Sequence, residues 1–256
     1  MTGLKTKLIH KLKATSIHLF ISLNILLFIL YLILFHWYPE PFFTAQGGWQ
    51  GIRLMAFVQL VLGPSLTFIV FDHLKQRKVI ISDLSIIAVV QAAALIWGGY
   101  QVYTQRPIAM VFWHDAFYTV TSDDYTEQGI DNPDFSKFSA HVPPLIYSRP
   151  LSTEAEMEQF TRLTEKSIPV YAHVSLYENI EDNLSSIFSR GVDIEEVMSK
   201  NASMRAELEK IVQGNVAGYN YIALNAKYHN MVLILDKNGN LKGELKAPYL
   251  ESLYSN

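Results

Sequence analysis

Three long apolar segments follow one another early in the chain, separated by two short polar loops. Residues 14–35, 52–71 and 84–103 number 22, 20 and 20, and none of these segments contains Asp, Glu or Lys. At the helical rise of about 1.5 Å per residue, each is roughly 30 Å long, the thickness of a bilayer hydrocarbon core. Helices of soluble proteins usually keep a polar face, which these segments lack. We therefore predict three transmembrane helices that form a bundle.

Charge is distributed unevenly over the 256 residues. Residues 1–106 carry nine Lys and Arg against three Asp and Glu, whereas residues 107–256 carry twelve against twenty-one. We expect a membrane domain over 1–106 and a soluble domain over 107–256. The acidic second domain is a poor candidate for binding nucleic acid or an anionic membrane surface. Because cysteine is absent, disulfides, thiolate catalysis and Cys-ligated zinc are excluded.

The positions of the cations predict how the helices cross the bilayer. Four lysines precede the first segment and three cations lie in the second loop, but the first loop, 36–51, has no Lys or Arg. By the positive-inside rule, the N-terminus and the second loop are cytoplasmic. Three crossings then leave residues 107–256 in the periplasm, so we expect a multi-pass bacterial inner-membrane protein. The first segment should remain as an anchor, since the apolar region of a signal peptide is only about 7–15 residues long.

Three polar residues interrupt the apolar segments: Asn24, Gln59 and Gln91. At the helical rise they lie at similar depths, so we expect interhelical hydrogen bonds between them. A conduction path is disfavoured, because such paths usually carry ionisable groups. Intramembrane polar packing is therefore the role we assign to these residues.

Small residues and a proline mark the second and third segments. Pro64 follows Gly63 and cannot donate its backbone nitrogen, so a kink is expected there. Ala88 and Ala92 are four residues apart, a spacing that suits close helix approach. These residues either only pack the bundle or form a groove that receives another helix.

The pattern after residue 107 mixes strands and helices and predicts an α+β domain. Thr153 with Glu156 has the pattern of a capping box that opens a helix. Asp193 with Glu196 has the same pattern and opens a helical stretch that is expected to break near Asn201 and to stop at Gly214. The remaining predictions are a strand over 108–120 interrupted at 114–115, an irregular stretch over 121–148, a strand over 170–176, and closing strands over 219–226, 230–235 and 241–245.

A search for chemistry yields no catalytic or metal-binding motif. His114 and Asp115 are adjacent on a predicted strand and so point to opposite faces. Asp236–Asn240 resembles the start of a calcium loop but lacks the downstream Glu, which favours a hairpin turn. The acid cluster from Asp123 to Asp134 fits a solvated loop. We therefore predict no enzyme, no catalytic residue, no cofactor and no metal site. A membrane-bound periplasmic enzyme and a membrane-anchored periplasmic sensor or transporter accessory subunit stay open as alternatives.

An ordered set of short motifs across nearly the whole chain resembles the TfpX/TfpZ family of type IV pilin accessory proteins. One departure is Ala116, where the family has a basic residue. The matching stretches are Trp37–Phe43 with Gly47-Gly48, Val61–Thr67 through Phe71, Asp83-Leu84 with Gln91, Arg106-Pro107, Val111-Phe112, Asp115–Phe117, Asn225–Lys227 and Leu233–Asp236.

The resemblance implies an inner-membrane protein that acts, in the manner of a chaperone, on pilin stability and on pilus assembly or dynamics. Its expected partners are the major type IV pilin, held in the membrane by one apolar helix, other pilus assembly components and the lipid bilayer. We expect the bundle to hold the pilin helix and the acidic domain to meet the pilin head. The candidate partner-binding residues are Trp37, Tyr38, Pro39, Gly63, Pro64, Ala88 and Ala92.

Overall fold

The structure, a computed structural model, describes residues 2–46, 48–126, 128–131, 133–199 and 202–247. Contacts divide the chain into two compact units. The helical unit comprises Met1–Pro39 and Gly48–Tyr103, and the sheet unit comprises Glu40–Gly47 and Thr104–Asn256. The sequence predicted one boundary, after residue 106. The structure differs in assigning part of the first loop to the sheet unit. Gly47 of the first-loop motif lies outside the described residues.

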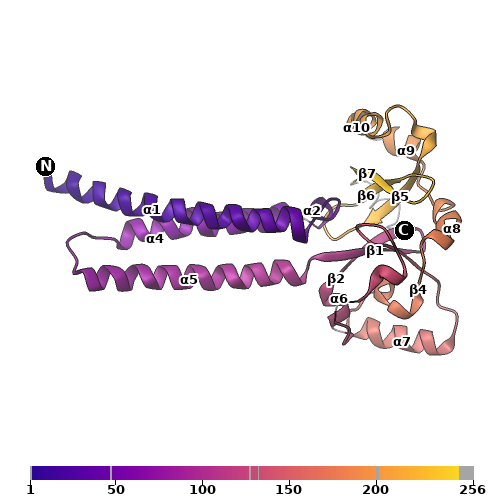
Figure 1. Cartoon of the computed structure of the whole chain (residues 1–256), viewed down its shortest axis with the longest axis horizontal. Coiled ribbons are helices and arrows are strands. Elements are labelled where there is room, and N and C mark those ends of the chain that lie inside the picture. The colour runs from indigo at the N-terminus through magenta and orange to yellow at the C-terminus, as the bar shows by residue number, and fades with distance from the viewer. Residues whose placement is uncertain (1, 47, 127, 132, 200–201, 248–256) are drawn as a thin grey trace. The chain divides into compact units, whose positions relative to one another are not determined.

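Three helices long and apolar enough to cross a membrane make up the helical unit, as the sequence predicted. The first is α1 (Thr2–Leu32), which continues as a π-helical turn over Ile33–Trp37. The second consists of α3 (Gly48–Ala56), a π-helical segment (Phe57–Leu62) and α4 (Gly63–Val70). The third is α5 (Arg77–Thr104). Figure 1 shows α4 running alongside α1.

The first and third helices begin earlier than the apolar segments do. The sequence predicted residues 14 and 84 as starts, whereas α1 begins at Thr2 and α5 at Arg77. The added turns carry lysine and arginine, which are good helix formers, so hydropathy marks only part of each helix. The π-helical segment before Pro64 was not predicted. Such segments bend helices and occur often at functional sites.

The sheet unit contains seven strands in the order β4-β3-β1-β2-β5-β6-β7. β1 pairs in parallel with β3 and β2 in parallel with β5, and the other neighbours are antiparallel. The bounds are β1 Pro107–Trp113, β2 Ala116–Thr121, β3 Leu145–Ser148, β4 Tyr177–Glu178, β5 Asn220–Asn225, β6 Met231–Leu235 and β7 Leu241–Lys246. Short helices connect them: α2 Phe42–Ala45, α6 Ser122–Thr126, α7 Glu154–Glu165, α8 Leu184–Phe188, α9 Ile194–Ser199 and α10 Ala202–Val212. The predicted fold class, three apolar helices followed by an α+β domain, is confirmed.

The predicted interruption of the stretch 108–120 at His114 and Asp115 is confirmed, whereas the predicted strand over 170–176 is wrong. The stretch 108–120 is a hairpin of β1 and β2 with His114 and Asp115 in its turn, and φ of His114 is 58°. The stretch 170–176 forms two 3₁₀ turns instead of a strand. Ala172 and the adjacent His173 are both buried, so burial along this stretch does not alternate as it does in a half-buried strand. The predicted irregular stretch 121–148 contains α6 and β3 in addition.

Several local predictions are confirmed. Thr153 and Glu156 form the capping box of α7 with both hydrogen bonds present. Asp193 accepts the backbone N–H of Glu196, which caps α9. The last two strands are joined by the turn at Asp236, whose carboxylate accepts the backbone N–H groups of Asn238 and Asn240.

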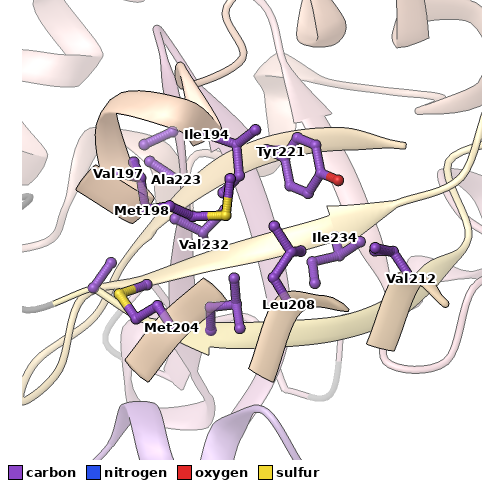
Figure 2. Close-up of a cluster of buried hydrophobic side chains, with 13 residues drawn as sticks. Ile194, Val197, Met198, Met204, Leu208, Val212, Tyr221, Ala223, Val232 and Ile234 are labelled. Atoms are coloured by element: carbon purple, nitrogen blue, oxygen red, sulfur yellow. The ribbon is translucent and has the colours of Figure 1, made fainter. Parts of the chain in front are cut away.

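Two apolar clusters fill one face of the sheet. Along β2, Ala116 belongs to the first cluster and Val120 to the second, and alternation places both on the same face. In the first cluster, side chains of α9 and α10 such as Met198 and Leu208 cover Ala223 and its neighbours on β5 and β6 (Figure 2). The second cluster covers β1 and β3 around Tyr125, whose hydroxyl is 2.5 Å from that of Tyr177. Tyr118 lies between the two clusters.

Candidate functional site

A partly buried polar cluster joins the three apolar helices of the helical unit. His18 of α1 lies with Nδ1 2.6 Å from Thr67 Oγ1 of α4 and Nε2 2.7 Å from Gln91 Oε1 of α5. Because an amide oxygen only accepts, Nε2 carries the proton and donates to Gln91, while Nδ1 forms its hydrogen bond with the threonine hydroxyl. Both ring nitrogens of His18 are thus hydrogen-bonded, and this one side chain connects all three helices.

Gly63 makes room for this cluster. A Cβ at this position would lie 1.8 Å from Gln91 Nε2 and 2.5 Å from its Cδ, so any side chain must displace the amide. The amide also donates to Val58 O at 3.5 Å, the carbonyl to which Gly63 N–H bonds across the π-helical segment. Pro64 is buried beside it. Gly63 and Pro64 are therefore packed within the bundle at its polar cluster.

An apolar groove of about 260 Å³ runs beside the cluster, formed by residues of all three helices. His18 and Thr67 line its polar side, and Ala88, one of the predicted partner-binding residues, lines its wall on α5. The other lining residues are Ala14, Ile17, Ile21 and Leu84. The groove thus combines an apolar surface with a histidine inside an apolar helix.

The small residues further along α5 meet no other part of the described chain. Ala92 is exposed, and no atom lies within 4 Å of a Cβ built on Gly98 or Gly99. Only 6% of the apolar span of α5 is buried, against 33% for the second helix. The backbone of α5 at Ala92 and at Gly98, on two different faces of the helix, is therefore available for another helix or for lipid.

The other predicted polar residues do not join one network. Asn24 is exposed, and its amide donates to Phe20 O at 2.7 Å, which is a bond within its own helix. Gln59 is 3% exposed. Among these three residues, within the part of the chain that the structure describes, Gln91 makes the interhelical side-chain bonds, and its side-chain partner is His18, which was not among the predicted residues. The signal in the sequence was that His18 is an ionisable residue within the apolar segment 14–35.

Aromatic residues join the ends of α1 and α5. Tyr38 is buried, and its hydroxyl donates to Val102 O at 2.8 Å. Trp37 packs edge-on against Tyr103 with ring centroids 5.3 Å apart. Pro39 is exposed. Of these three first-loop candidates, two are therefore engaged in packing the helical unit and one is exposed.

Ion pairs hold the opposite end of the helices. Lys7 of α1 contacts Asp72 at 2.6 Å, and Lys75 contacts Asp83 at 2.7 Å. Lys11 donates to the carbonyls of Phe68 and Ile69 at the end of α4. Hydrogen bonds from Lys7 and from the Leu74 backbone lower the pKa of the Asp72 carboxyl. The lysines that predict a cytoplasmic face thus also close the bundle.

The first-loop segment 40–46 packs within the sheet unit. Ala45 is buried, and its carbonyl accepts from the backbone N–H groups of Tyr228 and His229 at 3.2 and 3.3 Å. The Gln46 amide donates to the Thr119 hydroxyl on β2. This segment, which the sequence placed in the membrane domain, is thus a part of the sheet unit.

A polar pocket of about 530 Å³ opens beside Gln46 in the sheet unit. Tyr118 and Tyr171 stack there with centroids 4.5 Å apart, and Asn225 donates to the Tyr118 hydroxyl at 3.1 Å. Burial, with the nearby Asp124 carboxylate and Tyr118, raises the pKa of Tyr171 to about 12. Asp124 itself accepts from the Thr121 backbone at 2.6 Å, so it caps a turn.

Within the part of the chain that the structure describes, no three His, Asp or Glu side chains gather as metal ligands would. Asp134 caps the 3₁₀ turn of Phe135–Lys137 by accepting from Ser136. These bonds from Ser136 lower the pKa of the Asp134 carboxyl. The predicted solvated acidic loop therefore has a local structural use at both Asp124 and Asp134.

Together these elements define a helical protein with three spans apolar enough to cross a membrane, joined to an α+β unit. Residues 6–47, which include most of α1 with His18 and the first-loop stretch Trp37–Phe43, match the family model described as Fimbrial assembly protein FimB. A fimbrial assembly protein of Dichelobacter nodosus, serogroups C1 and C2, is 33% identical over 120 residues, 47% of this chain and 92% of the relative. The serogroup E1 protein is 25% identical over 244 residues, 93% of this chain and 95% of the relative. The chain belongs to this family of fimbrial assembly proteins. No solved structure matches it.

Proposed function

We propose that this protein is a non-enzymatic accessory protein of the bacterial inner membrane that supports fimbrial assembly by binding the fimbrial subunit, a type IV pilin of the kind served by the TfpX/TfpZ family. In this proposal, the helical unit holds the apolar helix of the subunit. The sheet unit is periplasmic and meets the subunit's head.

The uncovered small residues of α5 carry this proposal. Ala92 is exposed and Gly98 has no neighbour within 4 Å, so a second helix has space to approach the α5 backbone closely. Close packing of small residues is the main source of helix association in lipid. The groove at Ala88 continues the same surface toward His18.

Family membership supports the choice of partner. The relatives are described as fimbrial assembly proteins, and the match covers both units of the chain. The absence of a catalytic motif in the sequence supports a binding role over an enzymatic one.

Site-directed photocrosslinking in cells tests the proposal. A photoreactive residue at Ala92 or at the exposed Leu62 should capture the fimbrial subunit, identified by mass spectrometry. Leu23 is the matched control, because it is 40% exposed and lies on the side of α1 opposite the residues that line the groove. Capture of lipid alone at Ala92 and Leu62 would rule out this surface.

A gene deletion separates this proposal from the alternative of a membrane-anchored sensor or transporter accessory subunit. Loss of the fimbrial accessory protein should reduce the number of surface fimbriae and the amount of subunit in the membrane. A sensor of another signal should leave both unchanged.

A further inference from the structure

The polar pocket of about 530 Å³ in the sheet unit has no part in the proposed function. It lies at the carboxyl ends of the parallel strands β2 and β5. β5 pairs with Ala116–Tyr118 and ends at Asn225, so Thr119–Thr121 extends past it. Side chains from both faces of β2, Tyr118 on one and Thr119 on the other, can therefore line the pocket. The crevice outside the carboxyl ends of parallel strands is a common position for ligands in open sheets.

Most residues that line this pocket have polar side chains. Apart from its two tyrosine rings, the apolar part of the lining is limited to Pro169 and Ala226. A ligand that fits must therefore offer many hydrogen-bonding groups of its own. The polar lining residues are Gln46, Gln105, Thr119, Thr121, Asp123, Asp124, Asn225 and Lys227.

Three polar groups of the lining are open to a ligand. The Tyr171 hydroxyl, the Asp123 carboxylate and the Gln105 amide have no hydrogen-bond partner among the residues that the structure describes. None of the three residues is buried. Together they offer both donors and acceptors, which is what a ligand with several hydroxyl groups requires.

Aromatic rings complete the pocket. The rings of Tyr118 and Tyr171 stack with centroids 4.5 Å apart, and Trp113 lies 6.1 Å from Tyr118 and 6.5 Å from Tyr171. Trp113 and Tyr118 also line an adjoining pocket of about 390 Å³, so the two pockets meet at Tyr118. Aromatic rings attract C–H groups because the ring face carries negative charge density.

From this lining we propose that the pocket binds a neutral oligosaccharide. A sugar ring carries hydroxyl groups at its rim and C–H groups on its faces. The hydroxyls match the open groups of Tyr171, Asp123 and Gln105, and the C–H faces match the aromatic rings. The adjoining pocket gives room for the next sugar of the chain.

Other ligand classes fit this lining less well. Asp123 and Asp124 outnumber the one cation, Lys227, so the lining repels a phosphate. An added peptide strand would need the free edge of β2. There the Thr121 N–H is already accepted by Asp124 at 2.6 Å, and the Thr119 hydroxyl accepts from Gln46.

Sugar titration of the full-length protein, in a detergent without a sugar headgroup, tests the inference. Trp113 is the only tryptophan of the sheet unit, so its fluorescence reports the site. The probes are cellotriose and N,N′,N″-triacetylchitotriose, which are neutral trisaccharides without and with acetamido groups. At least one should change the signal saturably, and Trp113→Phe should abolish the change. Tighter binding of triacetylchitotriose would assign the site to a glycan of amino sugars such as that of the cell wall, and tighter binding of cellotriose to a glycan without them.

Two variants distinguish a binding role from a structural one. Tyr171→Phe and Gln105→Ala each remove a group without a partner, so the unfolding temperature should stay the same while binding weakens about fivefold, as expected for one lost hydrogen bond. Gln159→Ala is the control, because Gln159 is an exposed amide on α7 outside the pocket.

Three results would overturn the inference: no binding of either sugar, undiminished binding by both variants, or tighter binding of trialanine or inorganic phosphate. The measurement does not involve a fimbrial subunit, so its failure is distinguishable from failure of the proposed function.

Discussion

The side-chain nitrogen of Gln91 lies 1.8 Å from the point that a Cβ on Gly63 would occupy. The backbone of Gly63 is ordinary α-helix, with φ −62° and ψ −54°, so its conformation does not require glycine. Glycine is required because the Gln91 amide occupies the space that a side chain would fill. This one contact explains why an otherwise helix-weakening residue lies inside an apolar helix.

Gly63→Ala should therefore destabilise the helical unit by dislodging the Gln91 amide from His18. The amide is the end of a flexible side chain, so we expect a cost of about 1–2 kcal/mol, the upper range for a hydrogen bond between membrane helices. Thermal unfolding in detergent measures it. Gly98→Ala is the control, because a Cβ there meets nothing within 4 Å. In a Gln91→Ala background the effect of Gly63→Ala should largely disappear; a cost that persists there would contradict this account.

The polar cluster itself should behave as a unit. His18→Leu leaves Thr67 and Gln91 without their partner among apolar side chains, so we expect a loss of about 1–2 kcal/mol. The triple change His18→Leu, Thr67→Val and Gln91→Leu removes all three polar groups and should recover much of that loss. Fimbriation of cells that carry the triple variant then separates function from stability. If the single and triple variants unfold alike, the hydrogen bonds do not matter for folding.

The sheet unit should lose stability in mild acid because of His173. This side chain is 2% exposed, its Nε2 atom has no partner among the described residues, and burial lowers its pKa. Below the ordinary pKa of about 6.5 the unfolded chain binds a proton that the folded chain refuses. The free energy of unfolding should therefore fall as pH drops from about 6.5 toward the lowered pKa. Unfolding curves at pH 7.5 and 5.5 measure this, and His173→Leu should flatten the difference; an equally steep loss in that variant would assign it to other groups.

The capping box of α7 gives a second acid-dependent contribution at lower pH. Hydrogen bonds from Arg149, together with those from the Ser152 and Thr153 backbones, lower the pKa of Glu156. The stability it contributes is present above the ordinary carboxyl pKa and is lost as pH falls below about 4. Glu156→Ala should lower the unfolding temperature at pH 7 and have less effect at pH 3. Glu158→Ala is the control, since its contact with Arg162 is exposed and at 3.6 Å.

Local sequence signals predicted much of this fold. Segment length and hydropathy identified the three helices, and the capping box at Thr153 and the turn at Asp236 were read correctly because both depend on neighbours within four residues. The π-helical segment before Pro64 and the 3₁₀ turns over 170–176 were missed. Both depend on packing against distant residues rather than on local spacing.

The candidate sites depend on such distant contacts even more strongly. His18 meets Thr67 and Gln91, which are 49 and 73 residues away in the chain. Motif spacing within a short stretch of sequence does not reveal a cluster assembled over such distances.

Membrane orientation is the prediction on which the choice of partner depends. The cations at the N-terminus and in the second loop predict that Gln76 is cytoplasmic and that Asn256 lies in the periplasm. Alkaline phosphatase fused after Asn256 should then be active, and the same enzyme inserted after Gln76 should be inactive. Immunoblots establish equal expression, because an unstable fusion also lacks activity. An inactive fusion at Asn256, made in normal amount, would put the sheet unit on the cytoplasmic side, where it has no access to the head of a fimbrial subunit held outside.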